Sequence, residues 1–361
     1  MQTATQASAS PFSALTQWLK ANTTVLIVLA GAIALPFVVA LLDGQSFSSL
    51  LANEAGQSKF VQGLMIEVFI LAIFAISYDL VFGVTGLLSF GHAMFFALGA
   101  YLSGVLLKTF GWGLLPALGM VALAAIVNAL LFSVVLPRVK GITFALVTLG
   151  IATVFWTAIQ SRELKDFTGG DVGLQGVVPP AFINTNTERL RFYFITLVIT
   201  LLVYLLYRRF VDSPTGKVCL AISQNENRAL MLGYNTFWFK LIVLIIASIT
   251  AALAGMLHMI HSPLVSPNVA GLGYTILALL IILIGGVGTL SGALVGALIY
   301  RLMTFLLEKW FGQYSNFLIG AVYVALVLFL PYGIVGTWKM RSFRIKEGRE
   351  RLARLFSGRK E

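Results

Sequence analysis

The stretch that decides the fold is "LMIEVFILAIFAISYDLVFGVTGLLSFGHAMFFALGAYLSGVLL", residues 64–107. A helix that spans a bilayer needs about 20 apolar residues, so this run is too long for one span and nearly right for two. The tetrapeptide "GVTG" at 83–86 supplies the break, since glycine favours a turn over a helix. We therefore expect two spans, 64–82 and 87–107, joined by a glycine turn.

Composition extends this reading to the whole chain. Of 361 residues, 58% are hydrophobic and 11% are charged, against about 25% charged in a typical soluble domain. The sequence predicts an all-α polytopic membrane protein with about ten transmembrane helices. The expected spans are residues 24–42, 64–82, 87–107, 114–136, 142–160, 191–207, 241–261, 274–290, 293–310 and 316–336.

The distribution of Lys and Arg predicts the orientation. With ten spans the side of the termini carries one cation before the first span, two in the next loop, five in 208–240 and nine after Gly336, against seven on the other side. Cytoplasmic loops collect Lys and Arg, so both termini of this multi-pass protein are expected in the cytoplasm. The net charge of +11 has this explanation, and we expect no nucleic-acid partner.

These assignments give three regions. Residues 1–22 form a cytoplasmic N-terminal segment, 23–336 the transmembrane domain and 337–361 a basic cytoplasmic tail suited to anionic lipid. An external loop at about 161–190 is a solvated connector or a docking surface. A cytoplasmic loop at about 208–240 is expected to contain one helix over 217–232 that ends at Gly233. This helix is either a plain amphipathic linker or a helix that fits a groove of a partner protein.

An internal echo connects the first glycine turn to a later one. "GVTGLLS" (83–89) recurs as "GGVGTLS" (285–291), and both copies are predicted at cytoplasmic turns before Gly- and Ala-rich spans. Small residues there suit turns and close helix packing. The residues assigned to these roles are Gly83, Gly86, Ser89, Gly91, Gly285, Gly288 and Ser291. Gly91 and Gly99, eight residues apart, are expected on one helix face.

Chemistry-bearing motifs are scarce. The chain has no G-x-x-x-x-G-K-[ST] phosphate loop, no zinc motif and one cysteine, Cys219. We therefore expect no catalytic residue, no metal and no cofactor bound directly by this chain. His92 and Asp79 are candidates for a translocation path. An ion-coupled secondary transporter is the alternative of a different class, with Glu67, Asp79, Arg301 and Glu308 as its ionisable groups, and Arg301 could pair with an acid on a partner chain.

Five segments in order resemble the permease subunits of branched-chain amino-acid ABC importers of the LivM type. They are "GLLSFGHAMFFALGAY" (86–101), "TGGDVGL" (168–174), "AISQNENRALMLGYNTFWFKL" (221–241), "GGVGTLSGALVGA" (285–297) and "LFLPYGIVG" (328–336). The third of these segments, 221–241, resembles the family's cytoplasmic coupling segment, which commonly has the form R-x-N-E-x-x-A-x-x-L-G followed later by Lys. The resemblance covers roughly residues 60–336 and is specific in combination.

The resemblance implies a type II importer fold that moves branched-chain amino acids with ATP hydrolysed elsewhere. It implies a LivH-like second permease, two cytoplasmic ATPase subunits that bind ATP and Mg, and a periplasmic binding protein. The segment 217–233 would then couple to the ATPase through Asn225, Glu226, Arg228, Ala229 and Gly233. Gln224 and Tyr332 depart from the family's pattern, and urea-importer permeases share much of it, so a urea or short-amide substrate stays open.

Overall fold

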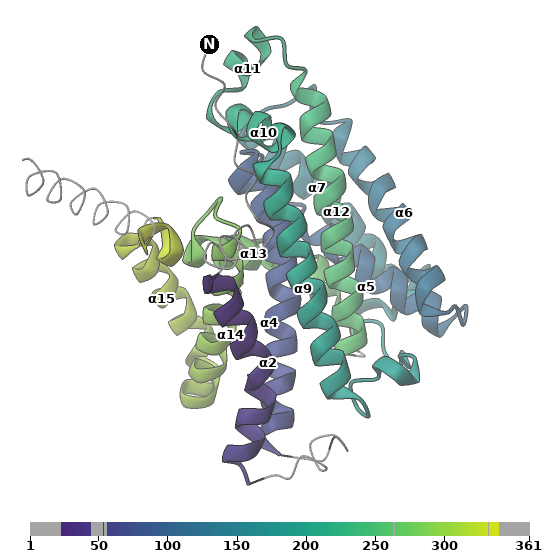
Figure 1. The fold of residues 1–361 in the computed structure, drawn as a ribbon. Helices are drawn as coiled ribbons and strands as arrows, with labels where there is room; N and C mark the ends of the chain where they lie inside the picture. Colours follow the sequence, from purple (N-terminus) through teal and green to yellow (C-terminus); the bar gives the residue numbers. More distant parts are fainter. Residues whose placement is uncertain (1–22, 45–52, 54–55, 263, 331, 339–361) are drawn as a thin grey trace, which may run out of the picture. The chain divides into compact units, whose positions relative to one another are not determined.

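The computed structural model describes residues 23–44, 53, 56–262, 264–330 and 332–338 (Figure 1). The predicted N-terminal segment 1–22 and nearly all of the predicted tail lie outside the described residues. The chain divides after Gly63 into two compact units. In the first, Ser58 Oγ donates a hydrogen bond of 2.8 Å to the Pro36 carbonyl, which ties the start of one helix to the middle of another.

The described residues form an all-helical, polytopic arrangement in which the β contact is an isolated bridge between Leu174 and Val265. Apolar runs form the helices because each satisfies its own backbone hydrogen bonds. The long elements are α2 (Thr23–Leu42), α4 (Gln57–Asp79), α5 (Ala93–Lys108), α6 (Leu114–Ser133), α7 (Ile142–Gln160), α9 (Arg189–Asp212), α12 (Thr236–His261), α13 (Leu272–Gly285), α14 (Ser291–Phe311) and α15 (Ser315–Phe329).

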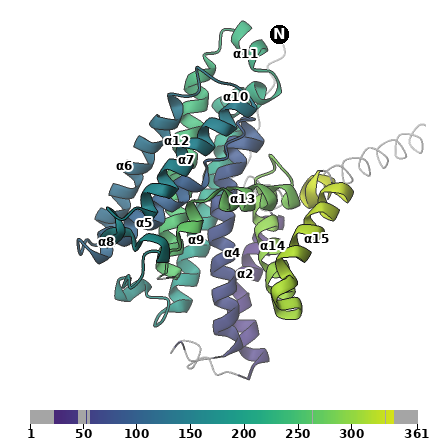
Figure 2. The ribbon, with the colours of Figure 1, turned by 180° about the vertical axis from the view of Figure 1, so that it is seen from behind.

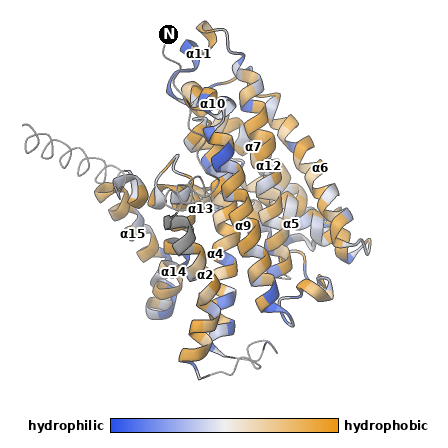
Figure 3. Ribbon diagram, in the orientation of Figure 1, coloured by the Kyte–Doolittle hydropathy of each residue, from blue (hydrophilic) through white to orange (hydrophobic). Residues whose placement is uncertain are grey.

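Each predicted span overlaps one of these helices, and hydrophobic residues predominate along them (Figure 3). Six helical stretches of the described chain are long and apolar enough to cross a membrane, and α5, α13 and the apolar part of α2 are shorter. The multi-pass character follows from these helices, whereas ten crossings stay a prediction. Short helices α8 (Lys165–Thr168), α10 (Pro214–Gln224) and α11 (Glu226–Met231) lie in the two long loops.

Three predicted boundaries were wrong, each for a local reason. A π-helical turn, Leu80–Val84, extends α4, and the next helix begins only at Ala93, so Gly91 precedes it. The predicted span 274–290 ends at Gly285 because Gly286 and Gly288 have φ of +122° and +71°. The single helix expected over 217–232 is two helices, since Asn225 between them is extended, with φ of −160°.

Helix packing in the second unit is closest between α5 and α12, which lie side by side in both views (Figures 1 and 2). A methyl group added to Gly99 would lie 2.6 Å from Cα of Ala252, and one on Gly255 would lie 2.9 Å from the Ala100 nitrogen. Both distances are too short for a Cβ. The two backbones therefore touch directly. In lipid the hydrophobic effect does not drive helices together, so they associate through close van der Waals packing of this kind.

This contact generates a stability prediction. Gly99→Ala forces a backbone shift against α12, and we expect the free energy of unfolding in detergent to fall by about 2 kcal/mol. Gly119→Ala is the matched control, because a Cβ on Gly119, inside α6, would have no neighbour within 4 Å beyond the backbone of its own helix. It is expected to be neutral or stabilising by up to about 1 kcal/mol. Equal melting temperatures for the two variants would contradict the close packing.

Candidate functional site

The loop between α9 and α12 is a folded projection at one end of these two helices (Figure 1). Its first helix, α10, starts where the Ser213 hydroxyl accepts a hydrogen bond of 3.2 Å from the Gly216 amide, with Pro214 at the first position. The buried face of α10 consists of Gly216, Cys219 and Ile222. Burial raises the pKa of the Cys219 thiol to about 11, so this cysteine is an unreactive packing residue.

The second helix, α11, is a six-residue turn whose two ends are fixed by side-chain and backbone caps. Asn225 Oδ1 accepts a hydrogen bond of 2.9 Å from the Arg228 amide at its start. At its end Gly233 has φ of +87°, and its amide donates to the Leu230 carbonyl at 2.9 Å. Ala229 is buried between these caps. Three of the five predicted coupling residues thus shape the turn.

Glu226, the fourth of these residues, braces α11 against the start of α12. Its Oε1 accepts a hydrogen bond of 2.5 Å from Lys240 Nζ and one of 3.0 Å from Thr236 Oγ1. The Lys240 side chain is 8% exposed and that of Glu226 22%. An ion pair so shielded from water is stronger than a surface pair. Glu226 therefore acts within the chain, while Arg228, the fifth residue, is exposed.

The brace is stable across the physiological pH range. Burial works to raise the pKa of Glu226, but the hydrogen bond and charge of Lys240, with the Thr236 hydroxyl, outweigh it and hold the pKa below its ordinary value of 4.5. A lowered folded-state pKa contributes stability that is fully present above the ordinary value. It is lost only as the pH falls through the lowered pKa, so the pair stays intact at neutral pH.

The outer surface of the projection is apolar. Met231 is 87% exposed, and Leu230 and Leu232 beside it are also exposed. Tyr234 and Trp238 add exposed aromatic surface on the way into α12. We call Leu230, Met231 and Leu232 the apolar tip. Apolar residues gathered on a polar loop mark an interaction surface.

The two echo turns meet in space. Asp79 at the end of α4 is fully buried, and its carboxylate accepts hydrogen bonds from the amides of Gly288 and Leu290. A Cβ on Gly83 would lie 2.5 Å from the Gly288 nitrogen. Ser291 starts α14. Asp79 thus lies between the two turns, and its place in a translocation path stays a prediction.

His92 is also fully buried, in the first echo region. Its Nε2 is 2.8 Å from the Ser77 hydroxyl, and its ring packs among Phe74, Tyr78 and Phe95. These contacts favour a packing role for His92, and its place in a translocation path stays a prediction. Ser89 in the same region is fully buried as well.

The remaining predicted glycines lie against other backbones. A Cβ on Gly91 would lie 3.0 Å from the Phe132 ring, and one on Gly285 would lie 2.8 Å from Cα of Gly292. Gly86 has φ of +74° and faces Ser223 of α10. Gly99, expected on the same helix face as Gly91, packs against α12, whereas Gly91 sits in the turn before α5.

Ionisable groups among the long helices pair within the chain. Arg301 Nε of α14 donates a hydrogen bond to Glu67 of α4, and His261 Nε2 is 3.8 Å from the same carboxylate. Arg301, which could have paired with an acid on a partner chain, therefore pairs with Glu67 of its own chain. A charge that is already neutralised locally gives less support to ion coupling.

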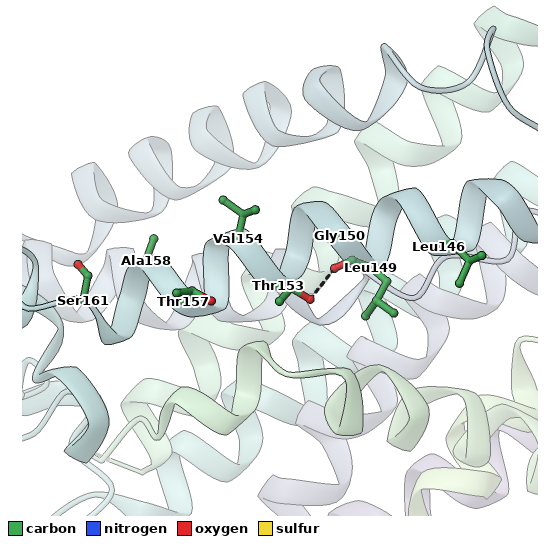
Figure 4. Close-up of a pocket in the computed structure, with 8 residues that line it drawn as sticks. All are labelled: Leu146, Leu149, Gly150, Thr153, Val154, Thr157, Ala158 and Ser161. Atoms are coloured by element: carbon green, nitrogen blue, oxygen red, sulfur yellow. Dashed lines mark hydrogen bonds between the residues drawn. The ribbon is translucent and has the colours of Figure 1, made fainter.

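An open groove follows one face of α7 (Figure 4). Its lining begins with Leu146, Leu149 and Gly150. Hydroxyl and apolar side chains then alternate along the helix at Thr153, Val154, Thr157, Ala158 and Ser161. The Thr153 hydroxyl donates to the Leu149 carbonyl at 2.9 Å. By contrast, large apolar residues such as Leu115, Leu123 and Leu131 cover the exposed face of α6.

Sequence reasoning missed two parts of the site. Lys240 and Thr236 were placed in the loop 208–240 without a role, although the lysine belongs to the family-like pattern, fourteen residues after Glu226, and signalled a partner for it. The α7 groove had no motif. Its signal was a set of hydroxyl residues at helical spacing, which only exposure distinguishes from ordinary helix-capping threonines.

Comparisons with known proteins agree on one family. A family model described as "Branched-chain amino acid transport system / permease component" matches residues 60–327. The permease protein LivM of the high-affinity branched-chain amino acid system of Escherichia coli K12 is 26% identical over 290 residues, covering 73% of this chain and 67% of that protein.

Two further relatives carry related descriptions. LivH of the same organism is 24% identical over 281 residues, covering 73% of this chain and 91% of that protein. A probable LivM of Methanocaldococcus jannaschii is 25% identical over 311 residues, covering 73% and 89%. No solved structure matches the chain.

The brace between Glu226 and Lys240 makes a charge-swap prediction. Glu226→Lys leaves two cations facing each other, and we expect protection of the 226–235 amides from hydrogen exchange to fall by the equivalent of about 2 kcal/mol. Glu226→Lys combined with Lys240→Glu restores the pair and should recover most of that loss. Arg228→Glu is the control on an exposed neighbour and should change little. Unaltered protection in Glu226→Lys would show that the pair does not hold α11.

Proposed function

The chain belongs to the branched-chain amino acid transport permease family, which confirms the resemblance carried by its motifs, and on that premise we propose that it is a permease subunit of an ATP-driven importer. It translocates leucine, isoleucine and valine across the bacterial inner membrane. It is not itself an enzyme, because two partner ATPases bind ATP with Mg and hydrolyse the ATP.

The observation that carries this proposal is the apolar tip. Leu230, Met231 and Leu232 are exposed at the end of a projection that Glu226 and Lys240 hold rigid. A rigid short helix with an apolar end is the shape that inserts into a groove of a partner protein. A membrane protein powered by soluble ATPases needs such a contact to receive motion.

The expected orientation of the chain supports this contact, because it puts the apolar tip on the cytoplasmic side of the membrane. The loop 208–240 carries five cations, so the positive-inside bias assigns it to the cytoplasm, where ATP is hydrolysed. Both termini lie on that side if the chain crosses ten times. The loop between α7 and α9 then faces outward, where exposed Val172, Val178 and Phe182 offer a surface to a substrate-binding protein.

The α7 groove is the favoured translocation surface. Thr153, Val154 and Thr157 are exposed there. Transfer of a hydroxyl group into lipid is less favourable than transfer of the leucine side chains of α6. We therefore place α7 against a second, LivH-like permease, so that the groove forms half of a passage. The mixed apolar and hydroxyl lining suits a branched aliphatic side chain better than the small polar urea molecule. Fully buried His92 and Asp79 are poorer path candidates.

Reconstitution tests the transport class. In proteoliposomes that hold the chain with a second permease, two ATPases and a binding protein, we expect leucine uptake that requires ATP and all components. The chain alone should give no uptake under a proton or sodium gradient. Gradient-driven leucine uptake by this chain alone would replace the proposal with an ion-coupled transporter.

A substitution in the apolar tip tests the docking contact. Met231→Asp places a charge where an apolar contact is expected, and we predict that the ATPase subunits bind the permease about tenfold more weakly or worse. Co-purification at graded detergent and salt concentrations measures this. Val178→Asp is the control, because Val178 is similarly exposed (77%) in the opposite loop. Normal ATPase retention by Met231→Asp would contradict the docking role of the tip.

A further inference from the structure

The two glycine turns of the internal echo, 83–89 and 285–291, lie in direct backbone contact. A Cβ on Gly83 would lie 2.8 Å from Cα of Gly288, and one on Gly288 would lie 3.2 Å from the Gly83 carbonyl oxygen. Any side chain at Gly83 would force the turns apart. The sequence echo therefore corresponds to a junction in space between α4 and the connection from α13 to α14.

The buried side chain of Asp79 links the two sides of this junction by hydrogen bonds. Its Oδ1 accepts a hydrogen bond of 2.7 Å from the Gly288 amide, and its Oδ2 accepts one of 3.1 Å from the Leu290 amide. The two amides, which are two residues apart in one turn, converge on a single carboxylate, as backbone amides of turns do when they bind an anion. The bonds link residues 209 and 211 positions apart, so the carboxylate holds the second turn to the end of α4.

The held turn contains a strained residue. Leu290 has φ of +46°, a left-handed conformation that disfavours any residue with a side chain and persists only when surrounding contacts enforce it. The bond from its amide to Asp79 is one of those contacts. The second turn is therefore shaped by Asp79 rather than by its own sequence preference.

The first turn contacts α10 on another side. A Cβ on Gly86 would lie 3.1 Å from Cβ of Ser223, and Ser223 is in the last turn of α10. The left-handed φ of Gly86, +74°, leaves glycine as the residue that fits there without strain. The turn 83–86 is thus packed between α10 and the second turn.

The second turn joins two helices that pack as closely as α5 and α12. A Cβ on Gly285 would lie 2.8 Å from Cα of Gly292, and one on Gly296 would lie 3.0 Å from the Ile281 carbonyl carbon. Helices in backbone contact move as a pair, because close-packed interfaces do not deform continuously. A shift of the second turn is therefore a shift of α13 and α14 together.

We infer that Asp79 is a positioning residue that transmits displacement of α10 to the α13–α14 pair, acting through the Gly83–Gly86 turn. The inference rests on the proposed function, since partner ATPases must move α10. In this inference the two glycine turns move together, because the Asp79 carboxylate holds the second turn to the end of α4. A static role, in which Asp79 only stabilises the fold, predicts a different outcome in the assembled transporter.

The first experiment measures the tie in the permease alone. Asp79→Ala removes both acceptors, and we expect hydrogen exchange of the 286–291 amides in detergent to accelerate about tenfold. Asp79→Asn keeps one carbonyl oxygen and should be intermediate, which also covers a failure of the alanine variant to fold. Thr85→Val is the matched control: it deletes the buried hydrogen bond from Thr85 to the Leu80 carbonyl without touching the second turn. Unchanged exchange at 286–291 in both Asp79 variants would overturn the inference.

The second experiment uses the assembled transporter with trapped nucleotide. In wild type we expect nucleotide to change hydrogen exchange in both 214–224 and 286–291. In Asp79→Asn the response at 214–224 should persist, the response at 286–291 should shrink, and leucine uptake per ATP hydrolysed should fall about tenfold. Thr85→Val should keep the wild-type ratio.

The outcomes separate this inference from the proposed function. A wild-type response at 286–291 in Asp79→Asn, or uptake and ATP hydrolysis that fall in equal proportion, would overturn the inference and leave the importer proposal standing. A wild-type complex without leucine uptake and without a nucleotide response at 214–224 would overturn both. The first experiment needs neither partner nor substrate, so it decides whether the tie exists in either case.

Discussion

Backbone-to-backbone contact is the constraint on which the second unit of this protein depends. In lipid, apolar side chains gain little from leaving the solvent, so helices hold together where their backbones approach closely. Gly99 and Gly255 provide that approach between α5 and α12, and Gly285 and Gly296 provide it between α13 and α14. The same device at Gly83 and Gly288 joins two turns.

The fold was largely predictable from the sequence because apolarity over about 20 residues is a direct signal of a spanning helix. The break near "GVTG" was predictable for the same reason, since a 44-residue apolar run must turn. Boundaries were less accessible where local backbone conformation decides them. The extended Asn225 divides α10 from α11 although the residues on both sides favour helix.

The candidate site was harder to derive, because its contacts join distant positions. The echo marked both glycine turns, yet a match in sequence does not reveal that the two copies touch. Asp79 was assigned to a path because a buried acid in a span is usually functional. Its partners are backbone amides more than 200 residues away, which no side-chain motif records. Glu226 was expected to face a partner protein, whereas Lys240 of the same chain holds it.

The use of charge within the chain bears on where the energy for transport enters. Glu67 is paired with Arg301, Glu226 with Lys240, and Asp79 with two amides. Each pairing joins separate helices or turns, so these groups serve as ties between parts of the scaffold. A transporter driven by an ion gradient needs an acidic group that exchanges its partner during the cycle. Ionisable groups that hold the scaffold together in this way are better suited to a transporter that partner ATPases move. The exposed apolar tip of α11 is the surface through which those partners would act.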